Sequence, residues 1–187
     1  LKWRPHNNIT KSNTFSTWTK VSSTVVDNAA VGPNGIANTA SVVTFPNTTS
    51  NLYNLSTVAV GAGDKVTLAA WVRSDTITSL TFAINGRTSL ANNAPEANLA
   101  VTSTWTLVSF EATVVADDTG LFFALGKVNA ASPASQIGEL ELYGAHMFRS
   151  DFGGMVNNPD TTSSYVPTTS AAVYAPRRGH HVYNGSA

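Results

Sequence analysis

The sequence predicts an all-β protein, an antiparallel β-sandwich of the jelly-roll type with an extended C-terminal arm. Apolar and polar residues alternate with a period of two in several short segments, which is typical of strands with one buried face. Turn-forming Gly, Asn, Asp and Pro residues separate these segments. No segment shows sustained helical periodicity, and parallel sheets would need helical crossovers. Short strands joined by such turns therefore favour an antiparallel sandwich.

The expected strands follow each other between residues 40 and 143. In chain order they cover residues 40–45, 66–73, 80–85, 108–114, 121–126 and 139–143. In the segment 66–73, the even-numbered positions are all apolar, so Trp71 and Arg73 share the opposite face. In the segment 80–85, Asn85 lies on the polar face. The dipeptide Asn85-Gly86 predicts a tight turn at the end of this strand.

The later strands carry acidic residues on their polar faces. Glu111 alternates with the apolar positions of 108–114, and Glu139, Glu141 and Tyr143 alternate with two leucines. Trp18 and Trp105 stand at the starts of expected strands, where we expect them to pack structurally. A bulge could turn Trp105 inward, although its parity matches that of Glu111.

Composition excludes several classes of protein. Lys and Arg together number 11, as do Asp and Glu, so the net charge is zero and no basic excess favours nucleic-acid binding. The apolar runs are too short to cross a bilayer as a helix, so membrane insertion is not expected. The chain has no cysteine, which excludes disulfides and thiolate metal sites.

The alternation fades after about residue 150, where prolines punctuate the chain. We therefore expect two parts, a sandwich over 1–150 and an extended Pro/Thr/Ser-rich arm or linker over 151–187 that leads to a partner or another module. An extended segment can add its backbone to the sheet edge of another subunit. The residues expected to carry assembly contacts are Tyr165, Pro167, Tyr174, Arg177 and Arg178.

The order of several short motifs resembles a module of bacteriophage tail fibres and other virion-surface proteins. The motifs are Asn7–Lys20, Gly32–Gly35, Ala70–Arg73, Thr104–Val108, Leu142–Ala145, Ser164–Thr169 and Ala175–Gly185. Such modules resemble carbohydrate-binding jelly rolls. The resemblance implies a viral, non-enzymatic structural protein at the virion surface, in a tail fibre or a capsid-decorating appendage.

The same resemblance implies the partners. They would be other virion proteins, further copies of this chain in a homo-oligomer such as a trimer, and a host-surface glycan for host attachment. An alternative interpretation is a glycan-binding module of a polysaccharide-active enzyme whose catalytic domain lies elsewhere.

Carbohydrate binding directs attention to outward-facing aromatic and polar residues. Sugar rings stack their C–H faces on aromatic rings, while polar groups bind the hydroxyls. If the strands share a sheet, their polar faces form one surface. Its candidate residues are Trp71, Arg73, Asn85, Glu111, Glu141 and Tyr143.

Catalytic and metal sites have weaker support. Glu139 and Glu141 could serve as a carboxylate pair, but glycosidases usually draw such a pair from opposite sides of a cleft. We therefore predict no catalytic residues and keep a hydrolase as a remote alternative. A structural calcium could use Asp64, Asp117 and Asp118, but the turn sequence is a common one, so we predict no metal or other cofactor.

Overall fold

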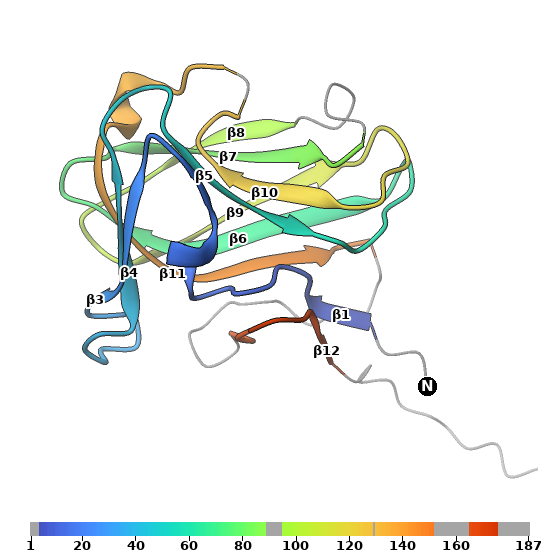
Figure 1. Ribbon diagram of the computed structural model, residues 1–187, viewed down its shortest axis with the longest axis horizontal. Helices are drawn as coiled ribbons and strands as arrows, with labels where there is room; N and C mark the ends of the chain where they lie inside the picture. Colours follow the sequence, from blue (N-terminus) through green and yellow to red (C-terminus); the bar gives the residue numbers. More distant parts are fainter. Residues whose placement is uncertain (1–3, 89–94, 129, 152–164, 176–187) are drawn as a thin grey trace, which may run out of the picture.

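The computed structural model describes residues 4–88, 95–128, 130–151 and 165–175, and they form a sandwich of two five-stranded antiparallel sheets (Figure 1). Sheet I contains, in spatial order, β2 (Thr19–Val21), β5 (Asn51–Ser56), β10 (Leu121–Leu125), β7 (Ser79–Gly86) and β8 (Glu96–Ala100). Sheet II contains β3 (Thr24–Ala30), β4 (Ala40–Phe45), β11 (Gly138–Arg149), β6 (Lys65–Arg73) and β9 (Thr106–Thr113). The predicted all-β sandwich is confirmed.

The smaller elements lie outside these two sheets. A two-stranded sheet pairs β1 (Arg4–Asn7) with β12 (Val173–Ala175), and two 3-10 turns are η1 (Phe15–Thr17) and η2 (Ala134–Gln136). Within the described ranges, no helix is long and apolar enough to cross a membrane.

The core lies between the two sheets, where the apolar alternation places it. Val66, Leu68, Ala70 and Val72 of β6 are all at most 1% exposed. On the facing sheet, Leu80, Phe82 and Ile84 of β7 are equally buried. Period-two alternation thus fixed the inward side of these strands because successive side chains in a strand point to opposite faces.

A group of aromatic rings fills one part of this core. Trp18 makes edge contacts with Phe15 and Phe123, with ring centroids 5.0 and 5.4 Å apart, and Phe123 contacts Phe82 at 5.6 Å. The indole Nε1 of Trp18 donates to the carbonyl of Lys11 at 3.0 Å, so the buried donor is satisfied. The structural role expected for Trp18 is confirmed.

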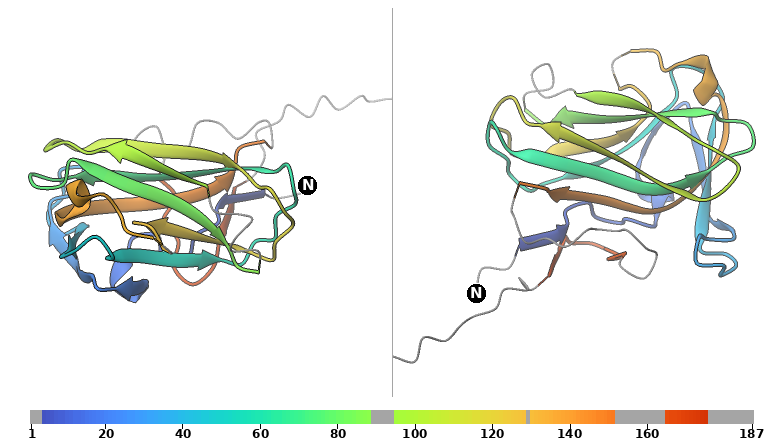
Figure 2. Two further views of the ribbon diagram at one scale, coloured as in Figure 1. Left: turned by 90° about the horizontal axis from the view of Figure 1, so that it is seen from above. Right: turned by 180° about the vertical axis from the view of Figure 1, so that it is seen from behind.

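The described part of the C-terminal arm returns to the sandwich. Figures 1 and 2 show β1 and β12 side by side on the outer side of sheet II, beneath β11. The backbone N–H of Lys11 donates to the carbonyl of Thr169 at 2.7 Å. Over residues 165–175 the chain therefore does not leave the sandwich, contrary to expectation, because polar groups of the N-terminal segment bind it.

The other expectations for the arm have separate outcomes. Pro167 is exposed, and Tyr174 pairs through its backbone with Pro5 of β1. Arg177 and Arg178 lie outside the described residues, so their assembly contacts stay a prediction. The division of the chain at residue 150 also stays a prediction.

Candidate functional site

Five of the six predicted glycan-binding residues lie on sheet II. In the strand register, Trp71 of β6 stands opposite Tyr143 of β11, and Arg73 stands opposite Glu141. Glu111 of β9 stands opposite Thr67 of β6. We call the outward side of β6, β9 and β11 the sheet II face. Its side chains point away from the core because their neighbours in each strand point into it.

Asn85 is the exception. It lies in β7 of sheet I, where its side chain points away from the sandwich core and is only 5% exposed. The expectation that it joins the other residues is therefore wrong. Alternation along a strand tells which side of its own sheet a residue occupies, but it does not tell which of the two sheets contains the strand.

Arg73 organises the charged part of the sheet II face. Its Nη2 and Nε lie 2.7 and 2.8 Å from Oε2 of Glu141. The guanidinium carbon lies 5.1 Å from the ring centroid of Trp105, a cation–π distance. Arg73 is therefore held between a carboxylate and an indole ring.

Trp105 belongs to this surface, although we expected it to pack structurally. It immediately precedes β9 and is half-buried, and its Nε1 donates to the carbonyl of Val31 at 3.2 Å. This bond joins the start of β9 to the connection between β3 and β4. The sequence signal was that Trp105 lies an even number of residues from Glu111, so that in an extended strand both side chains point to the outward side.

Trp71 is half-buried on the same face. Its indole Nε1 is shielded from solvent and has no hydrogen-bond partner among the residues that the structure describes. Buried donors in proteins are nearly always paired. The indole N–H is therefore a donor for which the described part of the chain supplies no acceptor.

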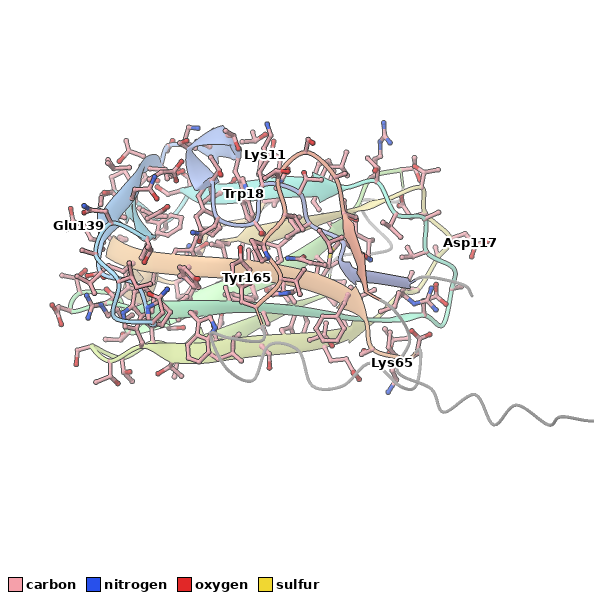
Figure 3. The ribbon with its side chains drawn as sticks, turned by 90° about the horizontal axis from the view of Figure 1, so that it is seen from below. Lys11, Trp18, Lys65, Asp117, Glu139 and Tyr165 are labelled. Atoms are coloured by element: carbon pink, nitrogen blue, oxygen red, sulfur yellow. The ribbon has the colours of Figure 1, made fainter. Side chains whose placement is uncertain are left out.

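Tyr143 differs from Trp71 because the returning arm covers it. The Tyr165 ring lies 5.2 Å from the Tyr143 ring, and its hydroxyl is 2.6 Å from Oγ of Ser12 (Figure 3). Burial raises the pKa of both tyrosine hydroxyls above the ordinary value. Tyr143 is 8% exposed, so its ring contacts Tyr165 and is not an open stacking surface.

The remaining carboxylates of the face are separated along the sheet. Glu111 pairs with Lys65 at 3.3 Å, and both side chains are about half exposed. Glu139 is exposed, and Figure 3 shows it at the opposite end of the sheet from Lys65. Because Glu139 and Glu141 belong to one side of one strand, they do not form the facing pair that glycoside hydrolysis requires.

The three aspartates considered for calcium each accept a hydrogen bond from a backbone N–H group. The bonds to Asp64, Asp117 and Asp118 have lengths of 2.7, 2.8 and 3.1–3.2 Å, and Asp64 also pairs with Arg149. In the described segments, no group of three or more His, Asp or Glu side chains could hold a metal ion. The absence of a structural calcium stays a prediction.

A second aromatic pair lies on the outer side of sheet I and was missed. Tyr53 and Phe122 are half-buried, with ring centroids 5.5 Å apart and planes at 89°. Phe122 stands opposite Asn85 in the register. The sequence signal for Phe122 was its place between Leu121 and Phe123 in an alternating run. Since these two neighbours are fully buried, Phe122 points outward.

Comparisons with known proteins show the fold of the chain. A scan against family models and a search of curated proteins gave no match. Among solved structures, the chain is similar to the CBM22-1 xylan-binding domain of Paenibacillus barcinonensis Xyn10C. The identity is 12% and the TM-score 0.54, with 80% of this chain and 97% of that chain covered.

The chain is also similar to the enzymatically active domain of tailspike protein 4 of bacteriophage CBA120. Here the identity is 15% and the TM-score 0.52, with 76% of this chain covered. The match spans only 21% of that chain, about a fifth of its length. At such identities both likenesses show the fold alone, the jelly-roll sandwich of carbohydrate-binding modules.

Proposed function

We propose that this chain is a non-catalytic carbohydrate-binding module whose glycan contacts centre on Trp71 of the sheet II face. The observation that carries the proposal is the grouping of Trp71 and Trp105 with the paired Arg73 and Glu141 on one outward surface. The similarity of the fold to that of a xylan-binding domain supports it.

Each part of the surface has a role in this proposal. The exposed part of the Trp71 ring offers an apolar area on which the C–H face of a sugar ring stacks. The Arg73–Glu141 pair supplies both hydrogen-bond donors and acceptors for sugar hydroxyls.

Replacing Trp71 with alanine is expected to weaken glycan binding at least tenfold, because the stacking surface is lost. A tenfold loss corresponds to about 1.4 kcal/mol. Affinity electrophoresis of the wild-type and W71A proteins in gels containing a panel of polysaccharides measures the effect. Thermal denaturation of both proteins separates lost binding from lost folding.

The matched control is Phe122→Ala, which removes a half-buried aromatic ring from the outer side of sheet I. This variant should bind glycans as the wild type does. If W71A keeps the wild-type affinity, or if the wild type binds no polysaccharide of the panel, the proposal is wrong.

For the biological setting, we propose a bacteriophage virion surface, in a tail or a capsid-attached appendage. The order of the sequence motifs supports this setting, as does the fold that the chain shares with part of a phage tailspike. The partners would be other virion proteins and further copies of this chain. A glycan-binding module attached to a polysaccharide-active enzyme remains the alternative, because a xylan-binding domain has the same fold.

The virion setting predicts a homo-oligomer. Multi-angle light scattering of the purified chain should give a multiple of the 19.6 kDa chain mass, three times that value for a trimer. The Tyr165 side chain is engaged within its own chain, so subunit contacts are expected from other surfaces. A mass of one chain at every concentration tested would contradict the oligomer.

A further inference from the structure

We infer that the sheet II face selects neutral glycans over acidic ones, an inference that rests on the proposed function. The charged side chains on this face are Arg73, Lys65, Glu111, Glu139 and Glu141. Two cations therefore stand against three carboxylates. A ligand that carries its own carboxylates meets a surface whose charge has the same sign.

The cation nearest to Trp71 is already bound. Nε and Nη2 of Arg73 both contact Oε2 of Glu141, and its guanidinium lies over the Trp105 ring. The side chains of the ion pair are only 32% and 30% exposed, so solvent screens it less than a fully exposed pair. A uronate that used the same donors would have to displace Glu141.

The other cation cannot take its place. Lys65 is the first residue of β6, and Figure 3 shows it at the opposite end of the sheet from Glu139. Lys65 also pairs with Glu111. Among the described residues, Arg73 is thus the single cation of the face near Trp71. The two negative charges of Glu139 and Glu141 exceed its one positive charge. Hydroxyl groups of a neutral sugar carry no such electrostatic penalty.

The test compares neutral polysaccharides with uronate-containing polysaccharides such as alginate and polygalacturonate, by affinity electrophoresis and titration calorimetry. The wild type should bind a neutral polymer at least tenfold more tightly than any acidic one. Its affinity for the neutral polymer should stay unchanged between about 50 and about 500 mM salt, because no net ionic contact is made.

The outcomes separate the inference from the proposed function. Equal or tighter binding of an acidic polymer, weakened by salt, would overturn the inference and leave glycan binding intact. Binding of neither class would overturn the proposed function, and the inference with it. Tighter binding of the neutral polymer that falls steeply with salt would also contradict the inference.

A variant tests the role of the ion pair directly. Glu141→Gln removes the carboxylate that occupies Arg73, so the affinity for acidic polymers should rise severalfold and the preference for neutral ones should narrow. Glu96→Gln is the matched control, because it frees Lys127 from an ion pair of 2.5 Å in another part of the molecule, at sheet I. An unchanged preference in folded E141Q protein would contradict the inference.

Discussion

Gly144→Val is expected to lower the free energy of unfolding by about 3–5 kcal/mol, the sum of backbone strain and overpacking. Gly144 lies in the bulge of β11 with a φ of +64°, a conformation that β-branched residues rarely adopt. A Cβ at this position would stand 3.2–3.4 Å from ring carbons of Tyr165. The valine methyl groups would therefore displace the ring that covers Tyr143.

Gly35→Val is the matched control for this prediction. Gly35 has a φ of +77°, but a Cβ placed there meets nothing within 4 Å. In this variant the free energy of unfolding should fall only by the cost of backbone strain, about 1–2 kcal/mol. Urea denaturation of the two variants measures the difference. Equal losses would show that Tyr165 does not restrict position 144.

The central strands were predictable because their pattern is local. In β6 every second residue is buried, and the resulting faces of Trp71 and Arg73 can be read directly from the sequence. Strand β3 does not show this pattern, because its residues are mostly exposed and its apolar positions do not form a continuous core face. The sheet to which a strand belongs depends on long-range pairing, which is why Asn85 was misplaced.

The position of the arm could not be read from the sequence for the same reason. Thr168 donates to the carbonyl of Ile9 at 2.5 Å, and its backbone N–H donates to Oγ of Ser12 at 2.8 Å. Polar residues of this kind look like exposed loop in a sequence, because nothing local shows that they are buried. Their partners lie more than 150 positions away in the chain.

Consequently, the candidate site was predictable only in part. The outward faces of three strands could be inferred, and they do form one surface. The cover of Tyr165 over Tyr143 and the contact of Arg73 with Trp105 both come from tertiary structure. The first contact covers the Tyr143 ring, and the second places the Arg73 guanidinium over the Trp105 ring. Trp71 has neither contact, so it stays the centre of the proposed site.

Because of the same kind of long-range contact, replacing Asn7 is expected to have a large effect on the free energy of unfolding. Its side chain is fully buried and joins three segments of the chain. Nδ2 donates to the carbonyls of Ala145 and Val166, at 2.9 and 3.1 Å. Oδ1 accepts from the N–H groups of Ile9 and Met147, both at 3.2 Å. One amide thus satisfies backbone groups of the N-terminal segment, the β11 bulge and the arm.

Asn7→Leu is expected to lower the free energy of unfolding by about 3–5 kcal/mol. Leucine has a similar size but no polar atoms, and each buried group left without a partner costs about 1–3 kcal/mol. Asn34→Leu is the matched control, because Asn34 is exposed and its side-chain oxygen accepts from the nearby Ile36. Its loss should stay below about 1 kcal/mol. Urea denaturation compares the two variants.

Amide hydrogen exchange in the N7L protein shows where the loss acts. The N–H of Thr168 should exchange faster than in the wild type, because the arm loses the bond from Asn7 to Val166. Amides of β7 in sheet I should exchange faster only to the extent that the free energy of global unfolding falls. A loss below about 1 kcal/mol in N7L, with Thr168 still protected, would mean that backbone pairing alone holds the arm. In that case the returning arm, and with it the cover over Tyr143, would not depend on Asn7.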